Sequence, residues 1–236
     1  MSGSDRDPAG RRVLLLAAGA AGIAALTSGC GSTTRHAHGT SAYRVSPAGL
    51  VSHTTPAPPV CVLSPETGEG PYYVPDASLR SDITEDREGV PLRLDLTVVR
   101  ATRNCAPLAG VAVDAWQADA LGEYSSGGAT YLRGTQLTDD AGRVTFRTIV
   151  PGWYAHVAPH VHVKVHPDAD TEVSTQLFLP EELLLRVFSR APYSARQAPA
   201  HPNLRDDRFE SKGPHLTLDP IPDGTGYKAS FTIGIA

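Results

Sequence analysis

Two histidines separated by a single residue are the most chemically suggestive feature of the sequence. His160 and His162 alternate with Val161 and Val163. In a β-strand, residues two apart point to the same face, so the imidazoles project side by side while the valines face apolar packing. Neutral imidazole is a common ligand for zinc, copper and iron. The pair predicts a metal site; the alternative is an edge strand with a solvated polar face, which Lys164 would continue.

Two tyrosines add to this prediction. Tyr154 follows a Pro-Gly turn shortly before His160, and Tyr124 lies in a loop after a predicted strand that ends at Trp116. A single tyrosine is most often structural, with a hydroxyl that finds a hydrogen-bond partner. Two of them preceding a pair of aligned histidines strengthen the case for a metal site.

The elements that must position these side chains are predicted to be short strands separated by turns. Alternation of apolar and polar residues predicts strands over 92–99, 111–116, 143–149, 161–165, 174–179 and 228–235. One short helix is predicted over 181–189, and the polar, Pro-rich stretch 192–220 is expected to wrap the surface. The pattern predicts an all-β fold, an antiparallel β-sandwich of immunoglobulin or prealbumin type with long loops and little helix.

The N-terminal region predicts export. Arg11 and Arg12 precede an uncharged run over 13–26 that is rich in Leu, Ala and Gly. This run has the length of a signal-peptide core and is short for a membrane span. Paired arginines favour the twin-arginine route, which exports folded proteins, and an ordinary Sec signal is the alternative. Residues 1–30 are therefore predicted to be a signal peptide.

Cys30 ends a stretch that resembles a lipoprotein processing site, although Thr27 stands where such sites usually carry Leu. Acylation of Cys30 would anchor the exported protein to the membrane, and the alternative is nearby cleavage that releases a free secreted protein. Residues 31–59 are rich in Ser, Thr, His, Gly, Ala and Pro, which predicts a flexible linker. A single catalytic domain is predicted over 60–236.

The other two cysteines and the net charge indicate a disulfide and the kinds of partner to expect. With Cys30 assigned to the lipid site, Cys61 and Cys105 remain as an even pair in an oxidising compartment, which predicts a disulfide; two buried thiols are the alternative. The formal net charge is −4 and no strongly basic block lies outside the signal, so nothing predicts nucleic-acid binding. Membrane contact is expected only through the lipid anchor.

Four motifs follow one another in the sequence around the tyrosines and histidines. They are Asp119-Ala120-Leu121-Gly122-Glu123-Tyr124-Ser125, Leu132-Arg133-Gly134-Thr135-Gln136-Leu137-Thr138-Asp139, Thr148-Ile149-Val150-Pro151-Gly152-Trp153-Tyr154 and His160-Val161-His162. In this order they resemble the iron-site segments of intradiol ring-cleavage dioxygenases. Segments 66–73 and 80–83 are similar to the extracytoplasmic branch of that family, and the resemblance covers most of 61–236.

The resemblance implies a non-haem Fe(III) site with four protein ligands, Tyr124, Tyr154, His160 and His162, and a hydroxide or water as the fifth. Phenolates are hard anionic donors suited to Fe(III), whose charge lowers the tyrosine pKa enough to ionise it near neutral pH. Two phenolates and a hydroxide balance the three charges of the ion, which favours the ferric state.

The implied activity is that of an oxidoreductase of aromatic compound catabolism. It would use O2 to cleave catechol-type substrates between the two hydroxyl-bearing carbons and give muconate-type diacids. Catechol would bind through both oxygens and displace Tyr154, which can then take a substrate proton. Gln176 would orient the site through hydrogen bonds. Tyr72 and Arg133 are the candidate substrate contacts.

Two positions depart from the family pattern. Val157 stands where the family usually carries an arginine, whose charge would stabilise negative charge on the substrate. Arg133, Arg196 and His156 are the candidates to replace it. Gln117 stands in place of a histidine that the family commonly has. The alternatives are therefore a catalytically weak module that binds iron or a metal–catecholate complex, and a transthyretin-like structural sandwich without a metal.

Overall fold

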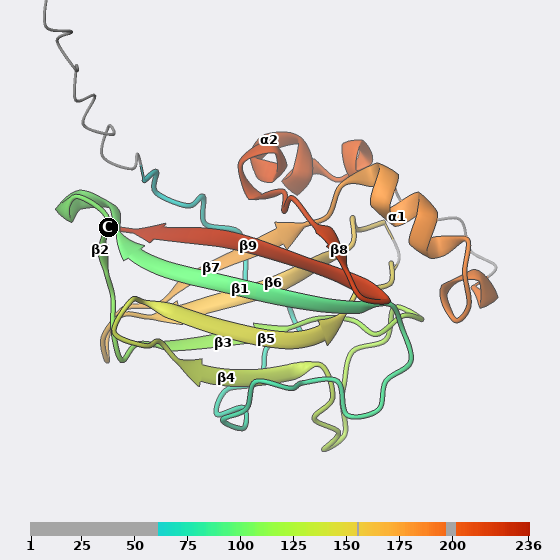
Figure 1. Ribbon diagram of the computed structural model, residues 1–236, viewed down its shortest axis with the longest axis horizontal. Coiled ribbons are helices and arrows are strands. Elements are labelled where there is room, and N and C mark those ends of the chain that lie inside the picture. The colour runs from blue at the N-terminus through green and yellow to red at the C-terminus, as the bar shows by residue number, and fades with distance from the viewer. Residues whose placement is uncertain (1–60, 155, 197–201) are drawn as a thin grey trace, which may run out of the picture. The chain divides into compact units, whose positions relative to one another are not determined.

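Two β-sheets packed face to face form the core of the protein, in the computed structural model that describes residues 61–154, 156–196 and 202–236. Figure 1 shows the two sheets as separate layers. The β-sandwich predicted from the sequence is confirmed, with one correction to its antiparallel pairing: the strands Pro91–Arg100 and Gly226–Ile235 pair in parallel. One sheet contains β2 (Ala106–Pro107), β1 (Pro91–Arg100), β9 (Gly226–Ile235) and β8 (Ile221–Asp223), with β5 (Arg143–Ile149) also paired to β1; the other has the order β4 (Arg133–Leu137), β3 (Ala112–Trp116), β6 (His160–His166) and β7 (Val173–Phe178).

Strand β1 organises the first sheet. It pairs antiparallel with β5 and parallel with β9 along most of its length. Leu92, Leu94 and Leu96 are buried from alternate positions, because successive side chains of a strand point to opposite faces. Val163 and Val165 of β6 belong to the same core cluster. The apolar alternation that predicted both strands is therefore the alternation that fills the space between the sheets.

Strand β6 lies in the interior of the second sheet, between β3 and β7. His162 pairs with Trp116 on β3 and with Gln176 on β7. His160, His162 and Lys164 are only 2–3% exposed. The alternative of an edge strand with a solvated polar face is thus excluded, and something must cover this face of the sheet.

The segment that precedes the first strand covers the outer face of β6. The Thr67 amide donates to the Ser174 carbonyl on β7 at 3.0 Å. Glu69 meets the buried ammonium of Lys164 at 2.6 Å, and the Tyr73 hydroxyl donates to Asp114 at 2.8 Å. A buried lysine needs such carboxylate partners because an unpaired charge is costly away from water. Residues 66–73 are therefore held down as a strap, and this strap carries Tyr72.

The helices differ in how well the sequence predicted them. Helix α1 (Glu181–Phe188) lies where a helix was expected and buries an apolar stripe. Helix α2 (Asp207–Leu216) falls within the stretch 192–220, for which no helix was predicted. Asp206 caps α2 by accepting from the Arg208 amide, and Phe209 packs on Phe178 of β7. The 3-10 helices are η1 (Ala101–Arg103), η2 (Tyr193–Ala195) and η3 (Asn203–Arg205).

The two cysteines of the domain are joined in the structure. Cys61 and Cys105 form a disulfide with their Cα atoms 5.7 Å apart, the pairing expected from the sequence. The predicted signal over 1–30, with Arg11, Arg12 and Cys30, lies outside the described residues, as does the linker over 31–59. No helix within the described ranges is both long and apolar enough to span a membrane.

We expect the double substitution Cys61→Ser, Cys105→Ser to lower the free energy of unfolding. The bridge closes a sequence separation of 44 residues, and for a loop of that size the loss of chain entropy in the unfolded state is worth roughly 4 kcal/mol. Urea unfolding of the oxidised domain and of the double variant measures the difference. Dithiothreitol should destabilise the parent protein by the same amount and leave the variant unchanged. Equal stability of parent and variant would contradict the prediction.

Candidate metal centre

Two imidazole nitrogens and a phenol oxygen converge on the outer face of the second sheet. The Nε2 atoms of His160 and His162 are 2.9 Å apart, and His162 Nε2 is 3.1 Å from the Tyr124 hydroxyl. The Tyr154 ring lies 5.4 Å from the Tyr124 ring and 6.1 Å from the His160 ring, measured between centroids. The structure thus brings together all four residues that the sequence proposed as metal ligands.

Burial keeps both histidines neutral, which is the ligand form. It lowers the pKa of His160 to about 4, and it lowers the pKa of His162 well below the usual value for histidine. His160 Nδ1 lies 2.7 Å from the Ala158 carbonyl oxygen. Because a carbonyl only accepts, the proton is on Nδ1, and Nε2, which lies 2.9 Å from His162 Nε2, carries the lone pair.

The ring of His162 is held between a tryptophan and a glycine. Trp116 stacks on it at 4.6 Å with an interplanar angle of 4°. On another side, Gly70 has a φ of +78°, and a Cβ added there would lie 3.3 Å from His162 Cε1. Any other residue at Gly70 would be strained and would crowd the imidazole. The strap over 66–73 therefore positions His162 as well as covering it.

Two loops supply the tyrosines and are tied to each other. The Gly152 amide donates to the Asp119 carbonyl at 2.9 Å. Asp119 also accepts the amides of Leu121 and Glu123 with its side chain, which shapes the loop before Tyr124. The Arg196 guanidinium donates to the carbonyl oxygens of Leu121 and Trp153, one in each loop. Arg196 therefore braces the two tyrosine loops through Nη1.

Burial and neighbouring rings keep the tyrosine hydroxyls protonated in the protein alone. Burial is the main cause that raises the pKa of Tyr124 far above its usual value, and the nearby Tyr154 and Tyr72 add to it. Burial likewise raises the pKa of Tyr154. Tyr72 stacks on Tyr124 at 4.3 Å and meets Tyr154 edge-on at 6.2 Å. Ionised phenols at this place would need a cation beside them.

The remaining residues named from the sequence have different surroundings. Both polar atoms of the Gln176 side chain are buried without a hydrogen-bond partner among the described residues, opposite His162. Gln117 donates to the Ile149 carbonyl at 2.8 Å and joins β3 to the end of β5. Arg133 donates to Ser125 and to the Tyr72 carbonyl, so its guanidinium holds the strap to the Tyr124 loop.

The segment between Tyr154 and His160 makes a tight turn. The Val157 amide donates to the Tyr154 carbonyl at 3.2 Å, and His156 has a φ of +59°. The Val157 side chain is buried, whereas His156 is exposed. Neither position supplies a guanidinium.

Two residues at the start of α2 adjoin the site: the sequence pattern loosely favoured Asp206 or Asp207 without giving either a role, and it did not point to Arg208. Asp206 is 4% exposed, and its carboxylate accepts the Ala158 amide at 2.8 Å. Arg208 lies 3.5 Å from the same carboxylate, and its charge lowers the pKa values of His160 and His162. The sequence signal was an Asp at a helix N-cap before an aromatic residue, which local pattern alone cannot connect to β6.

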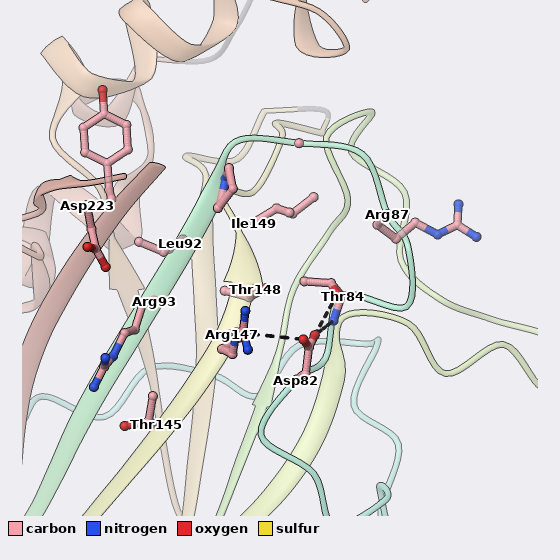
Figure 2. A pocket seen from close by; sticks show the side chains of 13 residues that line it. Asp82, Thr84, Arg87, Leu92, Arg93, Thr145, Arg147, Thr148, Ile149 and Asp223 are labelled. Carbon is pink, nitrogen blue, oxygen red and sulfur yellow. Dashed lines mark hydrogen bonds and ion pairs between the residues drawn. The ribbon is translucent and has the colours of Figure 1, made fainter. Parts of the chain in front are cut away.

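A separate cavity on the first sheet is a weaker candidate for the functional site than the histidine–tyrosine cluster. This cavity has a volume of about 710 Å³ and is lined from β1, β5, β8, β9 and the segment before β1, as can be followed in Figure 2. Its arginines lie near carboxylates: Arg147 is 3.9 Å from Asp82, and Arg93 is 3.0 Å from Asp95. None of the four converging residues lines it. We therefore assign the candidate site to the histidines and tyrosines.

The donor set fits a hard trivalent cation. Two neutral imidazoles and two phenols are gathered in a mostly buried, aromatic setting, with an unpaired polar side chain at Gln176. No group of three or more His, Cys, Asp and Glu side chains among the described residues is arranged to hold a metal ion. Oxygen donors at this centre would come from Tyr124 and Tyr154, and Fe(III) is a metal that phenolate oxygen favours.

Comparison with known proteins bears on this arrangement. Residues 68–200 match the sequence family described as "Dioxygenase". An intradiol ring-cleavage dioxygenase from Tetranychus urticae superposes with a TM-score of 0.71 and 31% identity, over 74% of this chain and 94% of that one. The chain belongs to the intradiol ring-cleavage dioxygenase family. Membership supports dioxygenase activity at the level of the family.

Two further relatives show the range of the family. The dioxygenase domain of a dioxygenase–carbohydrate-binding fusion from Streptomyces sp. SirexAA-E is 30% identical, with a TM-score of 0.58 over 74% of this chain and 98% of that one. Catechol 1,2-dioxygenase 1 of Acinetobacter lwoffii is 28% identical over 200 residues, which are 68% of this chain and 63% of that protein. The match thus spans less than two thirds of the latter relative.

We expect Arg196→Met to destabilise the protein by about 1–3 kcal/mol, because it removes charged donors from two backbone oxygens that nothing else replaces. Arg190→Met is the matched control, since Arg190 is exposed nearby at the end of α1. Urea unfolding reports the stability, and limited proteolysis reports opening of the loop over 119–124. Equal stability and equal proteolysis of the two variants would show that Arg196 does not brace the loops.

Proposed function

We propose that the protein is a non-haem Fe(III) dioxygenase that cleaves catechol-type aromatics between the two hydroxyl-bearing carbons with O2, giving muconate-type diacids. The observation that carries the proposal is the convergence of two neutral imidazole nitrogens and the Tyr124 hydroxyl within 3.1 Å, with Tyr154 beside them. Family membership supports the reaction type.

In this proposal Tyr124, Tyr154, His160 and His162 hold the iron. The ion would supply the positive charge that ionises the phenols and would bind the catechol. His160 keeps its orientation because Nδ1 donates to the Ala158 carbonyl. Trp116 and Gly70 fix the plane of His162. The protein thus presents its ligands with little reorganisation.

Tyr154 is the proposed acceptor for a substrate proton. It is the less buried of the two tyrosines and lies at the end of a tight turn. A phenolate released there has an ordinary pKa well above that of a carboxylate, so it is a competent base. Tyr72, whose ring is stacked on Tyr124 and is 42% exposed, forms a wall against which an aromatic ring can pack.

The alternative is a module that binds iron or a metal–catecholate complex with little turnover. The observation that favours it is the apolar side chain of Val157, which leaves the segment before His160 without a cation of its own. The two readings share the metal ligands and differ in whether O2 is consumed.

The test is a visible spectrum of the iron-loaded domain with catechol added under anaerobic conditions, followed by air. We expect a phenolate-to-iron band that shifts to longer wavelength with catechol and returns when O2 is admitted and the ring is cleaved. Tyr154→Phe should weaken the band and lower kcat by roughly a hundredfold or more. Tyr227→Phe on β9 is the control and should behave as the parent.

The outcomes separate the candidates. A catecholate band that persists in air would establish the binding module. A protein that stays colourless with Fe(III) available would overturn the metal assignment and leave a structural sandwich.

We propose further that the protein is exported, by the twin-arginine route, and anchored through a lipid on Cys30. Support comes from the pattern over 11–30 alone. We expect the parent to incorporate a radiolabelled fatty acid and to sediment with membranes. Cys30→Ser should abolish both, whereas Lys substitutions of Arg11 and Arg12 should retain the precursor in the cytoplasm. Membrane association that survives Cys30→Ser would contradict the anchor.

A further inference from the structure

The start of helix α2 is attached to the segment that leads into the histidine strand. The Asp206 carboxylate accepts the Ala158 amide with one oxygen at 2.8 Å and the Arg208 amide with the other at 2.9 Å. Asp206 is nearly fully buried, so both hydrogen bonds are shielded from water. One carboxylate therefore fixes the position of Arg208 relative to Ala158.

Stacked rings make a second connection between the same two elements. Phe209 meets Phe178 at a centroid distance of 5.2 Å, and Phe178 meets His160 at 5.9 Å, both edge to face. The residue after Arg208 is thus linked through one ring to the first histidine of the cluster. The two connections place the N-terminus of α2 beside the tyrosine–histidine cluster.

The guanidinium of Arg208 is available for a ligand. Its Nε lies 3.5 Å from Asp206, and within the described ranges its two terminal nitrogens have no hydrogen-bond partner. The side chain is 47% exposed. A permanent cation therefore lies at the end of α2 that these contacts attach to the histidine strand.

The other arginines considered for this role are committed elsewhere. Arg133 donates hydrogen bonds from Nε, Nη1 and Nη2 to Ser125 and to the Tyr72 carbonyl. Arg196 donates from Nη1 to two carbonyl oxygens of the tyrosine loops. Val157 is apolar and buried. Among the arginines named for this role from the sequence or the structure, Arg208 is the one near the cluster whose terminal donors are not used by the protein.

We propose that Arg208 is a substrate-positioning residue that stabilises the deprotonated catechol at the candidate centre, in place of a cation on the segment before His160. This proposal rests on the proposed function. A catechol that binds through both oxygens would lose two protons, one to Tyr154 and the other to the hydroxide expected as the fifth ligand, and its ring would become electron-rich. A guanidinium at the rim favours that anionic form by Coulomb attraction and by hydrogen bonding to a substrate oxygen.

The test compares Arg208→Gln with Arg205→Gln in the iron-loaded protein. Arg205 is exposed three positions earlier in η3, so its substitution removes the same charge without touching Asp206. The readouts are the phenolate-to-iron band without substrate, the anaerobic dissociation constant for catechol from the spectral shift, and kcat with KM in air. Urea unfolding checks that both variants are folded.

We expect Arg208→Gln to keep the band without substrate and to bind catechol roughly tenfold to hundredfold more weakly, the value of one hydrogen bond to a charged group. The kcat should fall as well, because the charge acts on the anionic substrate, while Arg205→Gln stays within about twofold of the parent. Arg208→Lys should recover part of the loss, because it restores the charge without the planar fork.

A second measurement distinguishes two roles for Arg208: stabilising the deprotonated catechol, or binding a substituent on its ring. The same titrations are run with 3,4-dihydroxybenzoate. A loss confined to this carboxylated catechol would assign Arg208 to substituent binding and overturn the proposal. Unchanged catechol affinity and kcat in Arg208→Gln would also overturn it.

Adding back a cation gives an independent check. Val157→Arg in the Arg208→Gln background should restore catechol affinity toward the parent value. If that double variant does not fold, the comparison of Arg208→Gln, Arg208→Lys and Arg205→Gln decides alone.

A parent protein that shows neither the band nor a response to catechol would overturn the proposed function, and the role of Arg208 would be overturned with it. If the parent protein responds to catechol and Arg208→Gln has the same catechol affinity and kcat as the parent, only the role of Arg208 is overturned.

Discussion

The burial of one polar strand face is the constraint on which the rest of the structure depends. Strand β6 sits inside its sheet with valines toward the core and polar residues on the outer face, and that face is nonetheless almost fully covered. Buried polar groups are costly unless each finds a partner. Lys164 is satisfied by Glu69 and Glu172. His160 and His162 are instead turned toward each other and toward Tyr124.

The elements that cover this face of β6 supply partners for its buried polar groups. The strap over 66–73 bonds to β7, packs Gly70 on His162 and places Tyr72 on Tyr124. The two tyrosine loops are joined through Asp119 and Arg196. Each of these contacts joins parts of the chain that are far apart in sequence. The centre is therefore assembled by tertiary contacts around one strand rather than by any local motif.

The sequence was sufficient for those features that have a local period. The strands were predicted because apolar residues alternate along them, and the common face of His160 and His162 follows from the same period of two. Helix α2 was not predicted, because Gly213 and Pro214 within it oppose a helix and its stability comes from the cap at Asp206 and from packing on β7. The surroundings of Arg208 could not be predicted either, because they depend on the same tertiary contacts of α2.

The double use of Asp206 has a consequence for motion. Its carboxylate is at once the cap of α2 and the acceptor for the Ala158 amide. A fluctuation that unwinds the first turn of the helix therefore also releases the backbone beside His160, so the two segments open as one cooperative unit. Any molecule that binds the closed form suppresses that opening and stabilises a helix it need not touch. Order at the centre and order in the C-terminal helix are thus thermodynamically coupled through a single side chain.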